Sequence, residues 1–215
     1  MDLTNFSQET KQQAKAYDFI GEKYEEVFGN NATQIAAVEW LIEHLSKEAS
    51  VLDVGCGTGV PTAKMLSEAG FKVQGIDVSP VMLKIATRKA PLAKFQLMDM
   101  ERIDLFPEKV DAIVAFFSLL GLRKSAIIKT INKITKILHD RGYFLLSMVE
   151  GDVDYVEQHF LDTTLRFSAY RKEELANILE AANFKILQVK TLDFIPKGNA
   201  PPEKQLYFFC QLEEK

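Results

Sequence analysis

Apolar positions along the chain follow two patterns, short continuous runs and stripes at helical spacing, which alternate from about residue 50 onward. The short runs are rich in β-branched or aromatic residues and predict seven strands: VLDVG, FKVQGIDV, KFQLMDM, VDAIVAFFSLL, YFLLSMVE, FKILQVKTLDFI and LYFFCQL. Between them, apolar residues three and four apart predict helices in PTAKMLSEAG, SPVMLKIATRKA, KSAIIKTINKITKILHDRG and RKEELANILEAAN. Strands and helices in alternation are typical of a mostly parallel sheet with helices on both faces.

Local signals mark the ends of several of these elements. Ser79 and Pro80 suit the N-cap and the first helical position. Gly70 and Gly142 are expected to end the helices that precede them. Residues 151–170 show a less regular pattern. A Pro/Gly-rich loop, without a helix, joins the last two strands, and these should therefore pair antiparallel.

The predicted fold class is α/β, a Rossmann-like seven-stranded sheet that is mostly parallel, with an antiparallel last strand and helices on both faces. The first 50 residues also carry helical patterns and predict an N-terminal helical cap. One of its helices has an apolar face formed by Ile35, Val38, Leu41, Ile42 and Leu45. We expect a single domain over residues 1–215.

Composition narrows the class of protein. Hydrophobic residues make up 47% and charged residues 26% of the 215 residues, as in a soluble globular domain. The net charge of -4 disfavours a nucleic-acid partner bound through a basic surface. The N-terminal sequence lacks the apolar core of a signal peptide, and no run is long enough to span a membrane. Cys56 and Cys210 are too few for a disulfide framework or a zinc site, so we expect a cytoplasmic protein without a metal.

Three glycines follow the first predicted strand directly, in VLDVGCGTGV at residues 51–60. Gly55, Gly57 and Gly59 leave the backbone bare in a strand–turn–helix unit. In open α/β sheets such a turn lies at the carboxyl ends of the strands, and the next helix points free N–H groups at the same place. The glycines therefore predict a ligand cradle.

Two carboxylates indicate which ligand the cradle holds. Asp77 ends the second predicted strand, 22 residues after Gly55, where an acid can accept hydrogen bonds from ribose hydroxyls. A dinucleotide fingerprint would place its third glycine where Val60 stands. Asp53 beside the loop also favours a ligand with a positive group over a pyrophosphate. The ligand is thus expected to contain a nucleoside and a cation.

The motif D-V-G-C-G-T-G at residues 53–59 closely resembles the first motif of class I S-adenosylmethionine-dependent methyltransferases. The resemblance extends over roughly residues 50–190. It implies S-adenosylmethionine as the cofactor and S-adenosylhomocysteine as the product. Carried over residue by residue, it implies a cofactor site formed by Tyr17, Tyr24, Asp53, Gly55, Cys56, Gly57, Asp77, Val78, Met82, Asp99, Met100, Ala115 and Phe116.

The resemblance also implies roles. Asp77 would bind the ribose, Asp99 would accept from the adenine amino group, and Ala115 or Phe116 would offer a carbonyl to the ammonium.

Within the domain, we expect residues 1–48 to form the helical cap and residues 49–150 the cofactor-binding core. Residues 151–170 would be a substrate-side insertion, followed by a C-terminal helix and antiparallel strands at residues 171–215.

Methyl transfer to oxygen usually needs a base, and the chain offers few. His159, in the insertion, and Glu150, at the end of the fifth strand, are the catalytic candidates. Many relatives carry a histidine near the end of strand four, where this chain has Ser118. Phe117 is expected to belong to the core. The substrate wall is expected to include Phe116, Leu119, Tyr155 and Phe160.

These observations predict a methyltransferase acting on a small or medium metabolite through an oxygen or nitrogen acceptor. The Asn/Asp-Pro-Pro-Tyr/Phe motif of base and glutamine methylation is absent, which also disfavours a nucleic-acid substrate. Two alternatives stay open: a nicotinamide-dependent oxidoreductase, and a non-catalytic cofactor-binding protein. The sequence does not decide the acceptor, the pathway or the oligomeric state.

Overall fold

The computed structural model describes residues 6–28, 31–196 and 202–214. Its helices are α1 (Gln8–Ile20), α2 (Lys23–Phe28), α3 (Ala32–His44), α4 (Thr62–Glu68), α5 (Pro80–Lys89), α6 (Lys124–Ile137) and α7 (Lys172–Ala181), with 3₁₀ turns η1 (Met100–Leu105) and η2 (Leu119–Gly121). Its strands are β1 (Ser50–Val54), β2 (Lys72–Asp77), β3 (Lys94–Leu97), β4 (Val110–Phe116), β5 (Leu138–Val149), β6 (Val153–Phe160), β7 (Thr163–Ala169), β8 (Phe184–Phe194) and β9 (Glu203–Leu212).

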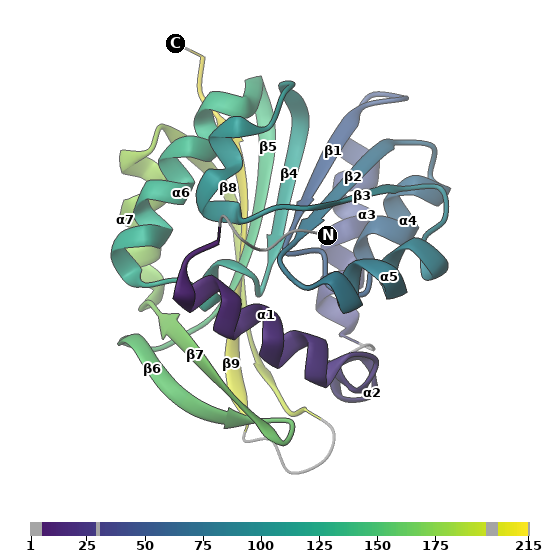
Figure 1. Ribbon diagram of the computed structural model, residues 1–215. Helices are drawn as coiled ribbons and strands as arrows, with labels where there is room; N and C mark the ends of the chain where they lie inside the picture. Colours follow the sequence, from purple (N-terminus) through teal and green to yellow (C-terminus); the bar gives the residue numbers. More distant parts are fainter. Residues whose placement is uncertain (1–5, 29–30, 197–201, 215) are drawn as a thin grey trace.

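Seven strands form one sheet in the order β3-β2-β1-β4-β5-β9-β8 (Figure 1). Strands β3, β2, β1, β4 and β5 pair in parallel, and β9 runs antiparallel to both of its neighbours. The predicted fold class and the antiparallel pairing of the last two strands are thereby confirmed. The carboxyl ends of β1, β2, β3 and β4 consequently meet at one edge of the sheet.

Helices cover both faces of this sheet because its central strands are apolar on both sides. In β4, Ala112, Val114 and Phe116 pack in the core that contains side chains of α3 and α4. The intervening Ile113 and Ala115 pack in the core that contains side chains of α6 and α7. Alternation between two buried faces is what a continuous apolar run such as VDAIVAF requires.

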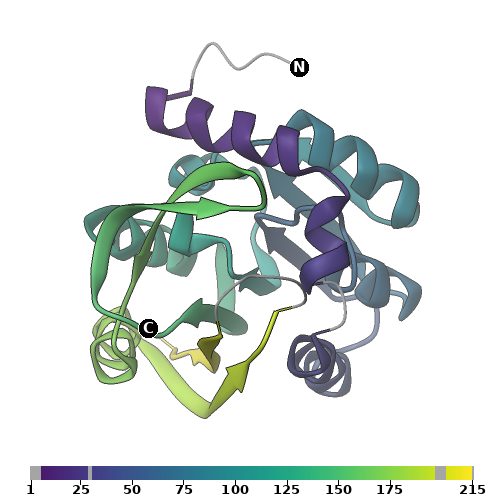
Figure 2. The ribbon, with the colours of Figure 1, turned by 90° about the horizontal axis from the view of Figure 1, so that it is seen from below.

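Helices α1 and α2 of the expected cap lie across the carboxyl edge of the sheet, whereas α3 packs on one of its faces beside α4. Helix α1 contacts α5 on one side and β7 on the other, and Figure 1 shows it crossing beneath the strands. Seen from below in Figure 2, α1 and the β6–β7 hairpin lie side by side over that edge. The cap and the hairpin therefore cover the place where ligands bind in open α/β sheets.

The helix expected to end at Gly142 ends five residues earlier, and this part of the prediction is wrong. Leu138 has extended backbone angles (φ -84, ψ 145) and begins β5. Gly142 lies inside β5, where a Cβ would lie 2.8 Å from the His139 carbonyl oxygen and 3.0 Å from that of Asp111. The glycine permits a close approach of backbones, which leaves the same signal in the sequence as a helix end.

Residues 151–170, expected to be less regular, form an antiparallel hairpin of β6 and β7. Its two turn residues, Leu161 and Asp162, both have positive φ angles of 46° and 62°. Two successive positive φ angles are typical of a tight hairpin turn that favours Asn-Gly. The chain carries Leu-Asp there, so the usual sequence signal for this hairpin is missing.

The helix N-cap that the sequence predicts at Ser79 is confirmed at the start of α5, since the Ser79 hydroxyl accepts the Met82 N–H at 3.0 Å.

Candidate active site

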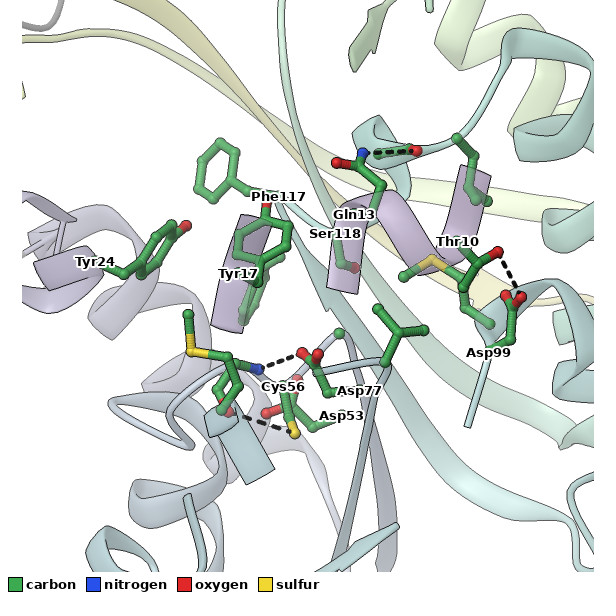
Figure 3. A pocket seen from close by; sticks show the side chains of 18 of the residues that line it. Thr10, Gln13, Tyr17, Tyr24, Asp53, Cys56, Asp77, Asp99, Phe117 and Ser118 are labelled. Atoms are coloured by element: carbon green, nitrogen blue, oxygen red, sulfur yellow. Dashed lines mark hydrogen bonds between the residues drawn. The ribbon is translucent and has the colours of Figure 1, made fainter. Parts of the chain in front are cut away.

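A cavity of about 290 Å³ lies between the carboxyl edge of the sheet and the helices α1 and α2 (Figure 3). Most of the residues predicted for the cofactor line it: Tyr17, Tyr24, Asp53, Gly55, Cys56, Gly57, Asp77, Val78, Met82, Asp99, Met100 and Phe116. Tyr155, predicted for the substrate wall, lines it too. The structure thus brings together residues from the cap, four strand ends and the hairpin.

The glycine loop shapes the floor of the cavity. Gly55 has a φ of 68°, and a Cβ there would lie 2.3 Å from the Ser118 Cβ. Glycine is therefore required for the ends of β1 and β4 to approach. At Gly57 the φ is 52°, and a Cβ would meet nothing within 4 Å among the described residues, so this position is bare backbone. Together they provide the turn and the bare backbone that the predicted cradle requires.

Asp77 is held rigidly at the end of β2. Its Oδ2 accepts the N–H of Gly57 at 2.9 Å, and its Oδ1 accepts the N–H of Ser79 at 2.8 Å. Burial raises the pKa of this carboxyl, and the hydrogen bonds from Ser79 and Gly57 oppose that rise. The result is a fixed acceptor at the cavity wall, suited to neutral donors such as hydroxyls.

Asp53 lies deeper and has no comparable support. It is 3% exposed, and its carboxylate has no hydrogen bond within the described ranges of the chain. Burial, and next the charge of Asp77, raise the pKa of Asp53 to about 7. A buried carboxyl without a partner is costly to ionise. A positively charged ligand in the cavity would supply the missing partner.

Asp99 connects the end of β3 to the cap. Its Oδ1 accepts the N–H of Glu101 at 2.9 Å, and its Oδ2 accepts the hydroxyl proton of Thr10 at 2.9 Å. Thr10 was missed by the sequence analysis, as was Gln13, whose Nε2 donates to the carbonyls of Gly121 (3.1 Å) and Arg166 (2.8 Å). With Tyr17 they follow a three- and four-residue spacing on α1, a signal that could have identified them.

Aromatic side chains of the cap close the cavity. The rings of Tyr17 and Tyr24 lie 6.4 Å apart edge to face, and Tyr24 stacks on Phe28 at 5.2 Å. Neither tyrosine hydroxyl has a hydrogen-bond partner among the described residues. Burial raises the pKa of both phenols, so both hydroxyls stay neutral. They are free to meet a ligand.

Three predicted contact residues lie behind the cavity wall. Ala115 and Leu119 are fully buried in the core beside α6. Phe160, at the end of β6, stacks on Phe28 at 5.6 Å and supports that ring from outside. Phe117, expected to belong to the core, packs against the core beside α3 and α4 and also lines the cavity, with a positive φ of 52°. Strand β4 ends at Phe116, four residues before the predicted apolar run VDAIVAFFSLL ends, and Phe117 and Ser118, which follow the strand, line the cavity.

The two predicted catalytic residues lie outside the cavity, which corrects that part of the prediction. His159 is exposed, because side chains of β6 alternate between faces and Phe160 takes the inner one. Glu150 Oε2 lies 3.8 Å from the ammonium of Lys204, and Glu150 Oε1 accepts the N–H of Lys172 at 3.3 Å. These contacts hold Glu150 between β9 and α7.

The charge of the lining is negative, even though Glu25 is paired with Lys89 of α5 at 2.7 Å. Six carboxylates and two cationic side chains are found among the described lining residues: Glu9, Glu25, Asp53, Asp77, Asp99 and Glu101, against Arg123 and Lys129. Arg123 is already paired with Glu9 at 2.5 Å. A pyrophosphate would be repelled here, whereas a sulfonium or an ammonium fits the unpaired Asp53. The cavity therefore fits S-adenosylmethionine better than a nicotinamide dinucleotide.

The described ranges of the chain hold no cluster of three or more side chains that could bind a metal ion. None of the helices in these ranges has the length and apolar character needed to cross a membrane.

Comparisons with known proteins agree with this geometry. The family described as "Methyltransferase domain" matches residues 25–189. The putative methyltransferase YqeM of Bacillus subtilis is 29% identical, with 80% of this chain and 88% of YqeM covered. In structure, the DhpI–SAH complex superposes with a TM-score of 0.73 at 18% identity, covering 96% of this chain and 98% of that chain.

Two further relatives carry substrate names. A ribosomal protein L11 methyltransferase of Dictyoglomus turgidum is 29% identical over 75% of this chain, which spans 47% of that protein. A dTDP-3-amino-3,6-dideoxy-alpha-D-glucopyranose N,N-dimethyltransferase of Streptomyces fradiae is 32% identical over 50% of this chain and 41% of its own length. This chain thus spans less than half the length of either relative. From its family match and its fold, the chain belongs to the methyltransferase-domain family and is a class I S-adenosylmethionine-dependent methyltransferase.

Proposed function

We propose that this methyltransferase acts on a small or medium metabolite through a nitrogen or oxygen acceptor. The observation that carries the proposal is the cavity itself, which holds an unpaired buried carboxylate at Asp53 beside bare glycine backbone and is closed by aromatic rings of the cap. The negative charge of the cavity lining suits a cationic cofactor. The cover that α1 forms over the cavity favours an acceptor small enough to fit between this helix and the sheet.

Several lining residues have a proposed part in holding the cofactor. Asp77 binds the ribose hydroxyls, and Asp99 accepts from the adenine amino group. Val78 and Met82, which is 1% exposed, pack on the adenine ring. The backbone of Gly55, Cys56 and Gly57 lies along the methionine part, with Asp53 near its ammonium. The Phe116 carbonyl stays a further candidate for that ammonium.

The bound cofactor supplies an electrophilic methyl group on a positively charged sulfur. The chain's own residues align the acceptor and exclude water, which is the main requirement of an in-line displacement. Tyr17, Tyr24 and Phe117 line the cavity beside the glycine loop and are proposed to hold the acceptor. Their neutral hydroxyls and rings orient it without adding charge.

The charge of the cavity also favours one class of acceptor. Among the described lining residues, the two cations are Arg123, which is paired with Glu9, and Lys129. A carboxylate or phosphate acceptor would therefore meet mostly acids. An amine or a neutral hydroxyl compound fits better, and the relative from Streptomyces fradiae is named for a dimethyltransferase acting on an amino sugar.

A protein acceptor is the second candidate, because another relative is named for methylation of ribosomal protein L11. The covered mouth of the cavity speaks against it. Helix α1 is fixed to η1 and to the hairpin by hydrogen bonds from Thr10 and Gln13, and a polypeptide would have to displace them. The proposal therefore keeps the small acceptor first.

A labelling experiment tests this assignment. The purified chain is incubated with methyl-labelled S-adenosylmethionine and either the small-molecule fraction or the protein fraction of a cell extract. We expect label in the small-molecule fraction, in compounds heavier by one methyl group. Asp77→Asn should abolish the transfer, and Asp193→Asn, a change on exposed β8, should not. Label confined to protein, or no label in either fraction, would contradict the proposal.

A further inference from the structure

Helix α1 reaches the end of β3 through one buried hydrogen bond. The Thr10 hydroxyl donates to Asp99 Oδ2 over 2.9 Å and joins residues that are 89 positions apart in the chain. Thr10 is 8% exposed and Asp99 is 6% exposed, and both line the cavity. Figure 3 shows this bond at the cavity wall. It is therefore part of the site and not a surface contact.

The direction of the hydrogen bonds around Thr10 follows from counting protons. Its hydroxyl has one proton, which goes to Asp99. The 2.8 Å contact between the Thr10 and Ser7 hydroxyls must then be donated by Ser7. Ser7 Oγ in turn accepts the backbone N–H of Thr10 at 3.0 Å. A row of donors thus starts at the N-cap of α1 and ends on the Asp99 carboxylate.

Asp99 is left with acceptor capacity only. A carboxylate offers about four lone-pair positions. One is used by Thr10 and one by the N–H of Glu101. A ligand that enters the cavity can therefore meet this carboxylate favourably only through a donor. A 6-amino purine presents that donor at position 6, whereas a 6-oxo purine presents an acceptor at position 6 and carries its donor at N1 instead.

We propose that Thr10 is a positioning residue for purine recognition, which holds Asp99 as an acceptor for a 6-amino group and thereby links the closure of α1 to the identity of the base. The inference rests on the proposed placement of the cofactor, in which the adenine lies beside Asp99. Because Thr10 belongs to the cap and Asp99 to the sheet, their hydrogen bond forms only when α1 lies over the cavity. The same hydrogen bond then both positions Asp99 for adenine and holds α1 over the cavity.

Ligand binding measured by calorimetry tests this proposal without any methyl acceptor. The ligands are S-adenosylhomocysteine and its 6-oxo analogue, S-inosylhomocysteine. Thr10→Val should weaken binding of the 6-amino ligand about tenfold, since a hydrogen bond to a charged group is lost. It should leave binding of the 6-oxo ligand unchanged, so that the ratio of the two dissociation constants falls. Thr10→Ser keeps the hydroxyl and should restore the ratio.

Two further variants separate positioning from general damage. Thr87→Val removes a similar threonine hydroxyl, one that donates to the Leu83 carbonyl at 2.8 Å on α5, and should leave the ratio unchanged. Because Thr10 acts through Asp99, Thr10→Val should have no added effect on the ratio in an Asp99→Asn background. An unchanged ratio in Thr10→Val, or equal weakening of both ligands, would overturn the inference. If the unaltered chain binds neither ligand, the proposed cofactor placement falls as well.

Discussion

Asp53 and Asp77 end neighbouring strands and line the same cavity, yet their surroundings differ. Asp77 accepts two backbone N–H groups, while Asp53 has no hydrogen bond to its carboxylate from any described residue. The pKa of Asp53 is raised to about 7, first by burial and then by the charge of Asp77. Asp77 is therefore ready to accept from a neutral donor, whereas Asp53 becomes a stable anion only beside a cation.

This difference predicts a dependence of stability on pH. In the unfolded chain Asp53 loses its proton near pH 4, but in the unliganded fold it keeps the proton to about pH 7. The folded state then binds more protons in this window, so the free energy of unfolding should fall as pH rises from about 4 to about 7. Asp53→Asn should remove up to about 1.4 kcal/mol per pH unit of that slope. Urea unfolding at several pH values would show it, and equal slopes in the two proteins would contradict it.

Gly55 and Gly57 allow a second test at this scale, since both have positive φ but only Gly55 is crowded. Gly55→Ala brings a Cβ to 2.3 Å from that of Ser118, so we expect it to lower the free energy of unfolding by about 2–4 kcal/mol. Gly57→Ala faces open space and should lose about 1–2 kcal/mol. Urea unfolding of both variants measures the difference. Equal losses would mean that the approach of β1 to β4 does not require Gly55.

At the scale of elements, the sequence predicts a helix, strand or turn best where only one kind of structure produces the observed residue pattern. The run VDAIVAFFSLL is correctly predicted as a strand buried on both faces, although the strand ends at Phe116, and the glycine loop with Asp77 indicates a nucleoside site. Gly142 was misread because a glycine at a close backbone approach looks like a glycine at a helix end. The β6–β7 hairpin turns at Leu161 and Asp162, which give no turn signal. Contacts such as that of Thr10 with Asp99 depend on how α1 packs, and local patterns do not contain that information.

The packing of α1 gives a prediction for the element itself. Asp18 Oδ1 accepts the Ser79 hydroxyl at 2.5 Å and the Val81 N–H at 3.1 Å, and so fixes α1 to the start of α5. Asp18→Ala should let α1 open more often, by roughly fivefold if about 1 kcal/mol is lost. Trypsin cleavage after Lys15, exposed on α1, would report the opening.

A matched variant controls this measurement. Glu43→Ala removes an exposed acid from α3 and should not change the cleavage rate after Lys15. S-adenosylhomocysteine should protect the site in Asp18→Ala as it does in the unaltered chain, because the bound ligand holds the cap closed. Cleavage that is no faster in Asp18→Ala would show that other contacts, such as those of Thr10 and Gln13, are enough to hold α1.

On the scale of the whole molecule, the fold gathers acids at one edge. The chain has a net charge of only -4, yet six carboxylates line one cavity of about 290 Å³. Parallel strands account for half of these acids, because Asp53, Asp77 and Asp99 lie at or just after the ends of β1, β2 and β3, which meet at the same edge. The other three come from α1, α2 and η1. A cationic ligand there removes repulsion that the unliganded fold has to bear. The division of the chain into cap, core and insertion, and its cytoplasmic location, stay predictions.

Because these acids repel one another, the thermal stability of the intact protein should depend on which ligand fills the cavity. S-adenosylhomocysteine at 100 times its dissociation constant should stabilise the fold by about 2.7 kcal/mol, which raises the melting temperature of a chain of this size by roughly 5–10 °C. NADH at the same concentration should give no shift, because its pyrophosphate would lie beside Asp53 and Asp77 and Val60 occupies the position of the third fingerprint glycine. Asp77→Asn should remove most of the shift with S-adenosylhomocysteine. A larger shift with NADH would mean that the carboxylates are neutralised in some other way, and that the charge of the cavity does not select its ligand.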